Sequence, residues 1–248
     1  AFRLLTTDNE SEALKLAKRI DELNTERRET ENEIFKKAAE TIEKEGLDHR
    51  RVIVVSGKGW HPGVVGIAAA RITERYGKPS VVISENGDVS SGSARSIEGF
   101  AVFDAIKYAS SLLTKFGGHK QAAGLSLKTE NIAAFREKIN EYAEAIPFVP
   151  PTLRLDCRLK PSALSLDLAD AIKQLEPFGA GNPTPVFGVF GVTLIRITPI
   201  GGGKHLRLLF SKAENTFQAL LFGVTPERFC FKEGDILDAA VTVETDFY

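Results

Sequence analysis

Residues 116–124 read Phe-Gly-Gly-His-Lys-Gln-Ala-Ala-Gly, and this stretch is the first candidate for a binding site. The adjacent glycines Gly117 and Gly118 let a backbone approach a ligand closely and leave main-chain N–H groups free. His119 follows at once and can donate a hydrogen bond to an anion or transfer a proton. The stretch predicts a site for a phosphate or a similar anion. The alternative is a tight turn between a helix and a strand, with an incidental histidine.

The segments around this stretch alternate between strand and helix patterns. Short runs predict strands at 51–56, 80–84, 89–96 and 125–128. Helices are expected at 64–76, 99–115 and 129–145, and the last two flank the glycine-rich stretch. This alternation is typical of an α/β domain.

A long segment at 11–45 contains no Pro or Gly and predicts one helix that ends at Gly46. At ~1.5 Å per residue it would be ~50 Å long, which suggests a connector between domains. Polar residues interrupt its apolar stripe. One of them, Arg27, either belongs to a solvated middle of the helix or faces a cleft.

Pro147, Pro150 and Pro151 predict a domain boundary, because three prolines in five residues cannot continue a helix. Beyond them we expect a helix at 162–175 and strands at 152–159, 186–198, 204–211, 216–222 and from 235 to the end, which favour a small barrel or sandwich. The predicted domains are a connector helix at 1–46, an α/β domain at 47–148 and an all-β domain at 149–248. The last strand lacks a later partner, so we expect a truncated barrel.

Composition limits the possible classes of function. With a net charge of −1 and 43% hydrophobic residues, the chain is globular, and any nucleic-acid contact needs local basic patches. Cys157 and Cys230 form no CxxC pair, which argues against a disulfide framework or a structural zinc and fits a reducing cytoplasm. No apolar run approaches the ~20 residues of a membrane span, and no signal peptide is visible. Because Met is absent, we expect a processed chain or a piece of a longer one.

Two further polar segments lie in the α/β region. In the loop at 59–63, Trp60 either stacks on a base or fills the core, and His61 is either a ligand-binding or a turn residue. In the strand at 89–96, alternation places Ser93 and Arg95 on one face, where they suit phosphate oxygens; an edge strand with a solvated face is the alternative. No paired carboxylates occur at metal or acid–base spacing, so the sequence predicts anion binding without a catalytic centre.

The all-β region combines basic and aromatic residues. Lys204 and Arg207 lie on or beside one predicted strand, together with His205, Lys212 and Arg196. Basic side chains interleaved with aromatic ones suit single-stranded nucleic acid. The alternative for most of the phenylalanines is a place in the core; these are Phe187, Phe190, Phe210 and Phe217.

Several of these segments together resemble a known family. The stretch GWHPGVVGIAAARITERYGKPSVVI at 59–83, then GSARS at 92–96 and FGGHKQAAG at 116–124, resembles the DHHA1 domain of the RecJ single-strand-specific exonucleases. LNTER at 23–27 resembles that family's connector between its two core domains. PFGAGNPTPVF at 177–187 and GGKHLRLLF at 202–210 resemble its oligonucleotide-binding (OB) domain.

The resemblance implies a 5′→3′ exonuclease that digests single-stranded DNA in recombination and repair with Mn²⁺ or Mg²⁺. The family's metal ligands, including an Asp-His-His triplet, lie in a DHH domain that this chain lacks, so the chain alone should be inactive. It also implies a bacterial cytoplasmic protein whose partners are single-stranded DNA, the DHH domain and a repair helicase or single-strand-binding protein. The implied phosphate contacts near the scissile bond are Arg95, His119, Gly117 and Gly118; Arg27 reaches the backbone from the connector, and Trp60, His61, Ser93 and Gln121 line the same groove.

Two other functions stay open. One is a DHH-family phosphodiesterase that acts on short oligonucleotides or cyclic dinucleotides, which usually lacks the appended OB domain. The other is a non-catalytic nucleic-acid-binding module, such as an accessory domain of a tRNA synthetase. The long connector and the loop around Trp60 argue against the second.

Overall fold

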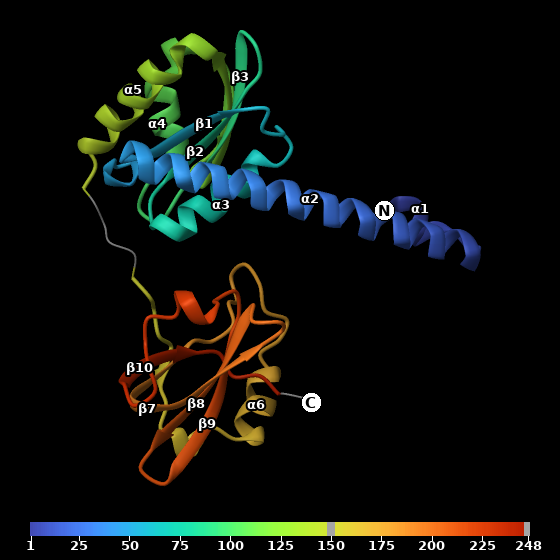
Figure 1. Ribbon diagram of the computed structural model, residues 1–248, viewed down its shortest axis with the longest axis vertical. Coiled ribbons are helices and arrows are strands. Elements are labelled where there is room, and N and C mark those ends of the chain that lie inside the picture. Colours follow the sequence, from blue (N-terminus) through green and yellow to red (C-terminus); the bar gives the residue numbers. More distant parts are fainter. Residues whose placement is uncertain (148–151, 246–248) are drawn as a thin grey trace. The chain divides into compact units, whose positions relative to one another are not determined.

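The computed structural model describes residues 1–147 and 152–245. Contacts divide the chain into a first unit at 1–151 and a second unit at 152–248. The predicted boundary at 148/149 lies outside the described residues. Both units follow the expected fold classes, with a long helix and an α/β sheet in the first and a curled β-sheet in the second (Figure 1).

A five-stranded sheet with the order β1-β2-β3-β5-β4 organises the first unit. Strands β1 and β2 are parallel and the other neighbours are antiparallel. The strands are β1 (Ile53–Lys58), β2 (Ser80–Glu85), β3 (Val89–Arg95), β4 (Leu113–His119) and β5 (Ala122–Lys128). The helices are α1 (Phe2–Thr6), α2 (Glu10–Glu45), α3 (Val65–Tyr76), α4 (Val102–Tyr108) and α5 (Ile132–Glu144), with 3₁₀ turns η1 (Leu47–His49), η2 (Ser110–Leu112) and η3 (Thr129–Asn131).

Helices cover the two faces of this sheet differently (Figure 1). On one face, Val82 packs with residues of α2 and α3 in one apolar cluster. On the other face, Ala94, Leu125 and Leu127 pack with residues of α4 and α5 in a second cluster. Since α3 contacts β2 and β3 while α4 contacts β4 and β5, the first face is covered mainly toward β1.

The long helix predicted at 11–45 is confirmed as α2. Asn9 accepts a hydrogen bond from the N–H of Glu12 at its start, and Gly46 ends it with a left-handed backbone (φ 65°). Its buried residues all lie in its C-terminal third: Ile34, Ala38, Ala39 and Ile42. This part packs on the first unit, and Figure 1 shows the rest of the helix extending past the sheet.

The predicted helix at 99–115 is wrong in its second half. Helix α4 ends at Tyr108, and residues Leu113–His119 form the edge strand β4, which turns through Lys120 and Gln121 into β5. The apolar stripe of α4 is complete by Ala109, so nothing in the core requires another helical turn. Phe116, which lies on β4, packs on Phe103 of α4, with ring centroids 6.0 Å apart.

In the second unit, four strands form a curled sheet with the order β10-β7-β8-β9, and short β6 pairs with β7. The strands are β6 (Cys157–Arg158), β7 (Phe187–Ile200), β8 (His205–Lys212), β9 (Asn215–Leu221) and β10 (Ile236–Val241); the other elements are α6 (Leu166–Lys173), η4 (Pro161–Ala163) and η5 (Pro226–Arg228). The first strand, predicted at 152–159, is reduced to two residues. The last strand ends at Val241, and residues 246–248 lie outside the described part.

Candidate nucleic-acid interface

Strand register brings four of the predicted site residues, Ser93, Arg95, Gly117 and His119, onto one face. Ser93 pairs with Gly124, which pairs with Gly117; Arg95 pairs with Ala122, which pairs with His119. Paired residues on neighbouring strands point to the same side of a sheet, and so do residues two apart on one strand. We call this side the polar face; it consists of Ser91, Ser93, Arg95, Ala122, Gly124, Ser126, Lys115, Gly117 and His119.

The middle of the polar face is a floor of small residues. A Cβ added at Gly117 would meet no atom within 4 Å, and one at Gly124 would meet only the Gly92 carbonyl oxygen at 3.9 Å. Arg95 and His119 stand on either side of this floor, two strands and therefore about 10 Å apart. A ligand backbone can thus approach the sheet closely between a cationic group and an imidazole.

Arg95 lies beside the first turn of α3. A Cβ at Gly66 would come within 3.2 Å of Arg95 Nη2 and 3.1 Å of Ser93 Oγ. Arg95 Nη1 donates to the Ala94 carbonyl at 2.8 Å, and the guanidinium makes no ion pair within the described residues. The N-terminus of a helix carries partial positive charge, so two positive groups converge here with no carboxylate between them. This arrangement favours an anion.

His119 presents one ring nitrogen to the outside. Its Nδ1 accepts a hydrogen bond from the Gln121 backbone N–H at 3.3 Å. In the neutral ring the proton then lies on Nε2, which becomes a donor on this exposed side chain. Gln121 is an exposed residue of the β4–β5 turn, and its backbone orients His119.

Gly118 plays a different part from Gly117. Its φ of 153° and the space around it exclude a side chain, because a Cβ would lie 2.4 Å from the Ala122 carbonyl oxygen and 2.5 Å from Ala123 Cα. A side chain at this position would point to the face covered by α4 and α5, opposite to the side chain of His119. Gly118 therefore shapes the strand that holds His119 and does not itself line the polar face.

The structure corrects the prediction that Trp60 lines the groove. Trp60 is 6% exposed and packs in the core cluster formed with α2 and α3. Its ring covers Gly57, where a Cβ would come within 2.2 Å of the indole, and its carbonyl accepts a hydrogen bond from the Ser84 hydroxyl. A ring enclosed in this way cannot stack on a base.

Two other predicted contacts have defined surroundings. His61 is exposed just before α3, and its Nδ1 accepts a hydrogen bond from the Gly63 N–H at 3.1 Å. Arg27 on α2 is partly exposed and forms an ion pair with Glu31 at 3.1 Å. Glu31 also pairs with Arg71 of α3 at 3.0 Å, so the described contacts of Arg27 place it at the α2–α3 contact.

In the second unit, Arg207 lies on the outer face of the sheet, since its neighbours Leu206 and Leu208 are buried. His205 points the same way and contacts Phe222 edge-on, with ring centroids 5.2 Å apart. Lys204 is exposed in the preceding turn. The core interpretation holds for Phe187 and Phe210, which are 8% and 3% exposed; Phe217 stacks on Phe210, and Phe190 lies under Arg158.

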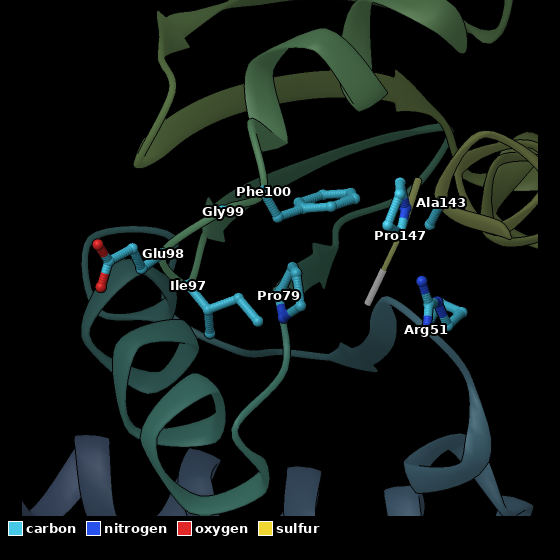
Figure 2. Close-up of a pocket in the computed structure, with 8 residues that line it drawn as sticks. All are labelled: Arg51, Pro79, Ile97, Glu98, Gly99, Phe100, Ala143 and Pro147. Atoms are coloured by element: carbon cyan, nitrogen blue, oxygen red, sulfur yellow. The ribbon is translucent and has the colours of Figure 1, made fainter. Parts of the chain in front are cut away.

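The small pocket in Figure 2 lies apart from these residues. It is lined by Arg51, Pro79, Ile97, Glu98, Gly99, Phe100, Ala143 and Pro147, and its volume of about 20 Å³ is room for little more than one water molecule. Within residues 1–147 and 152–245, no three His, Cys, Asp or Glu side chains gather to hold a metal. The residues present thus do not fit a metal centre, and we assign no metal step to them. None of the described helices is both long and apolar enough to cross a bilayer.

Comparisons with known proteins agree with the two units. Residues 49–145 match the DHHA1 domain family, and residues 155–248 match the RecJ OB domain family. The single-stranded-DNA-specific exonuclease RecJ of Bacillus subtilis is 35% identical over 215 residues, which is 84% of this chain and 27% of the relative. The RecJ of Escherichia coli is 33% identical over 222 residues, covering 83% of this chain and 37% of the relative.

Among solved structures, RecJ from Thermus thermophilus in complex with Mg²⁺ matches 99% of this chain with a TM-score of 0.77 and 27% identity. A second structure of that protein, in complex with Mn²⁺, matches 98% with a TM-score of 0.75. The chain spans 37% of each of these solved chains, about a third of their length.

Proposed function

Because the chain carries a DHHA1 domain followed by a RecJ OB domain, we propose that it is the strand-holding part of a single-stranded-DNA-specific exonuclease. The whole enzyme would digest DNA 5′→3′ in recombination and repair in the bacterial cytoplasm. Its Mg²⁺ or Mn²⁺ would be bound by a DHH domain outside this chain, so the chain alone would bind DNA without cutting it. A repair helicase or a single-strand-binding protein would be its protein partner.

The observation that carries this proposal is the surroundings of Arg95. Its guanidinium has no carboxylate partner among the described residues, lies beside the N-terminal turn of α3, and stands across a floor of small residues from His119. Phosphodiester oxygens are the ligand that suits this set: an arginine, an imidazole N–H and a floor on which a backbone can lie.

Each residue then has a distinct role. Arg95 and Ser93 would contact phosphate oxygens from β3, and the Nε2–H of His119 would do so from β4. Gly117 and Gly124 would let the sugar–phosphate backbone lie close to the sheet. In the second unit, Lys204 and Arg207 would hold a further part of the strand, and Arg27 and His61 are weaker candidates for the same role.

The test is fluorescence anisotropy of labelled single-stranded and duplex DNA with the chain and its variants Arg95→Ala and His119→Ala, at two salt concentrations. Charge-assisted hydrogen bonds contribute about 1.5–3 kcal/mol, so each variant should bind single strands roughly tenfold or more weakly. The salt dependence should also become shallower for Arg95→Ala, because this variant neutralises one phosphate fewer and releases fewer counterions.

The matched controls replace an arginine and a histidine that lie away from the polar face. Arg50 pairs with Glu137 of α5 on the opposite face, and His49 is exposed in η1. Arg50→Ala and His49→Ala should therefore leave binding unchanged. If Arg95→Ala and His119→Ala behave like these controls while DNA still binds, the polar face is not the binding site.

A further inference from the structure

The polar face continues along the strands beyond Arg95 and His119. Four residues before them on β3 and β4 lie Ser91 and Lys115, and both pair with Ser126 of β5. At about 3.4 Å per residue, this second row is about 14 Å from the first. Like the first row, it has one cationic side chain; here the cation is Lys115 on the edge strand, and Ser91 and Ser126 add two hydroxyls.

The serine hydroxyls of this face differ from the other serine hydroxyls of β2 and β3. Ser91, Ser93 and Ser126 are partly exposed, and their hydroxyls make no hydrogen bond within the described residues. The remaining serines of β2 and β3 all have partners: Ser80 with the Ala69 carbonyl at 2.8 Å, Ser84 with the Trp60 carbonyl, and Ser90 with Thr129 at 2.8 Å. Among the serines of β2 and β3, the two whose hydroxyls have no partner in the described residues, Ser91 and Ser93, therefore both lie on the polar face.

Lys115 is exposed and has no acidic partner in the described part of the chain. The polar face ends at the next pair of residues on β3 and β5, Val89 and Lys128. Val89 is apolar, and Lys128 already pairs with Glu130 at 3.5 Å. The unpaired ammonium group of Lys115 and the hydroxyls of Ser91 and Ser126 therefore lie in the same row of the polar face.

We propose that Lys115, Ser126 and Ser91 form a second phosphate subsite, which holds the same DNA strand about two nucleotide steps from the phosphate at Arg95. The strand then runs along β3, β5 and β4 over the glycine floor. This inference rests on the proposed function, because it needs a phosphodiester chain on the polar face. Strand alternation in the sequence already places Ser91 on the same face as Arg95, but sequence reasoning did not add Lys115, which was predicted in a helix, or Ser126.

The test compares a dinucleotide with a six-nucleotide single strand by equilibrium binding to the full chain. All proteins carry Lys204→Ala and Arg207→Ala, which remove candidate contacts in the second unit. Lys115→Ala should weaken binding of the six-nucleotide strand three- to tenfold, lower its salt slope by about 0.7, and leave dinucleotide binding unchanged. Ser126→Ala should give the same length dependence with a smaller loss. Lys107→Ala on α4, over the opposite face, is the control and should change neither.

The outcomes separate the two proposals. If Arg95→Ala weakens both ligands while Lys115→Ala behaves like Lys107→Ala, the polar face binds DNA and the second subsite is refuted. If Lys115→Ala weakens the dinucleotide as well, Lys115 belongs to the first subsite and the spacing is wrong. If Arg95→Ala changes neither ligand, the proposed function of the face fails, and the second subsite fails with it.

Discussion

Gly124 offers a direct test of the floor, because replacing it should weaken DNA binding without harming the fold. It lies in the middle strand of the polar face, and its space is open apart from the Gly92 carbonyl oxygen at 3.9 Å. Its φ is not in the left-handed range that only glycine tolerates. A valine here fits the strand and places methyl groups where a ligand backbone would lie.

Gly124→Val should leave the stability of the first unit equal or higher, and it should lower the affinity for DNA. Valine has a higher strand propensity than glycine, on a scale that spans about 1 kcal/mol, so the first unit should be equally stable or up to about 1 kcal/mol more stable. For a unit of this size, 1 kcal/mol corresponds to roughly 2–4 °C in Tm. A ligand raised off the floor loses its contacts with Arg95 or His119, and losing one charge-assisted hydrogen bond weakens binding roughly tenfold or more.

Thermal denaturation and fluorescence anisotropy on Gly124→Val give both numbers from one protein preparation. Equal Tm with tenfold weaker binding of single-stranded DNA supports the floor. Native affinity in a folded Gly124→Val protein would refute it, since no ligand backbone could then lie on this strand. A large drop in Tm would instead show that the space above Gly124 is not open.

Three further predictions concern stability. Gly118→Ala should destabilise the first unit by about 1–3 kcal/mol, because the new Cβ meets backbone atoms of β5 at 2.4–2.5 Å; a denaturant titration that matches the native protein would contradict this. Trp60→Ala should cost about 3–5 kcal/mol, as expected for a buried ring, whereas a ring that only stacks on DNA would leave Tm unchanged. Hydrogen bonds from the Tyr108 hydroxyl and then from Lys138 lower the pKa of Glu141. The contribution of Glu141 to stability is therefore present above its unfolded-state pKa and is lost as the pH falls through its folded-state pKa. The Tm difference between the native protein and Glu141→Gln should shrink in acid.

The regular elements of the first unit were predictable because their patterns are local. The segment that lacks Pro and Gly became α2, and strands expected at 80–84 and 89–96 are found at Ser80–Glu85 and Val89–Arg95. Strand alternation by itself places Ser93 and Arg95 on one side, and the strand register agrees with it. These features depend on the alternation of residues along a strand or on the positions of Pro and Gly, and both can be read directly from a sequence.

The pairing across the sheet was not predictable in this way. The stretch at 116–124 gives no periodic signal through Gly117 and Gly118, so the hairpin between β4 and β5 was not expected. A partial signal lay downstream, where Ala123, Leu125 and Leu127 alternate with smaller or polar residues. Edge strands such as β4 are defined by the partner they pair with, and that partner is a matter of tertiary structure.

The polar face follows from how few helices the chain supplies to that side of the sheet. Helices α4 and α5 cover one face with Leu125 and Leu127 beneath them, whereas α3 on the other face packs on β2 and β3. Large apolar side chains on the uncovered part of β5 would be exposed to water, so Ala122, Gly124 and Ser126 stand there instead. Within residues 1–147 no helix packs on this face of β5, which explains both the small residues and the hydrogen-bonding groups beside them. A ligand that supplies its own backbone and charge, such as a DNA strand, fits the position that a helix would otherwise take.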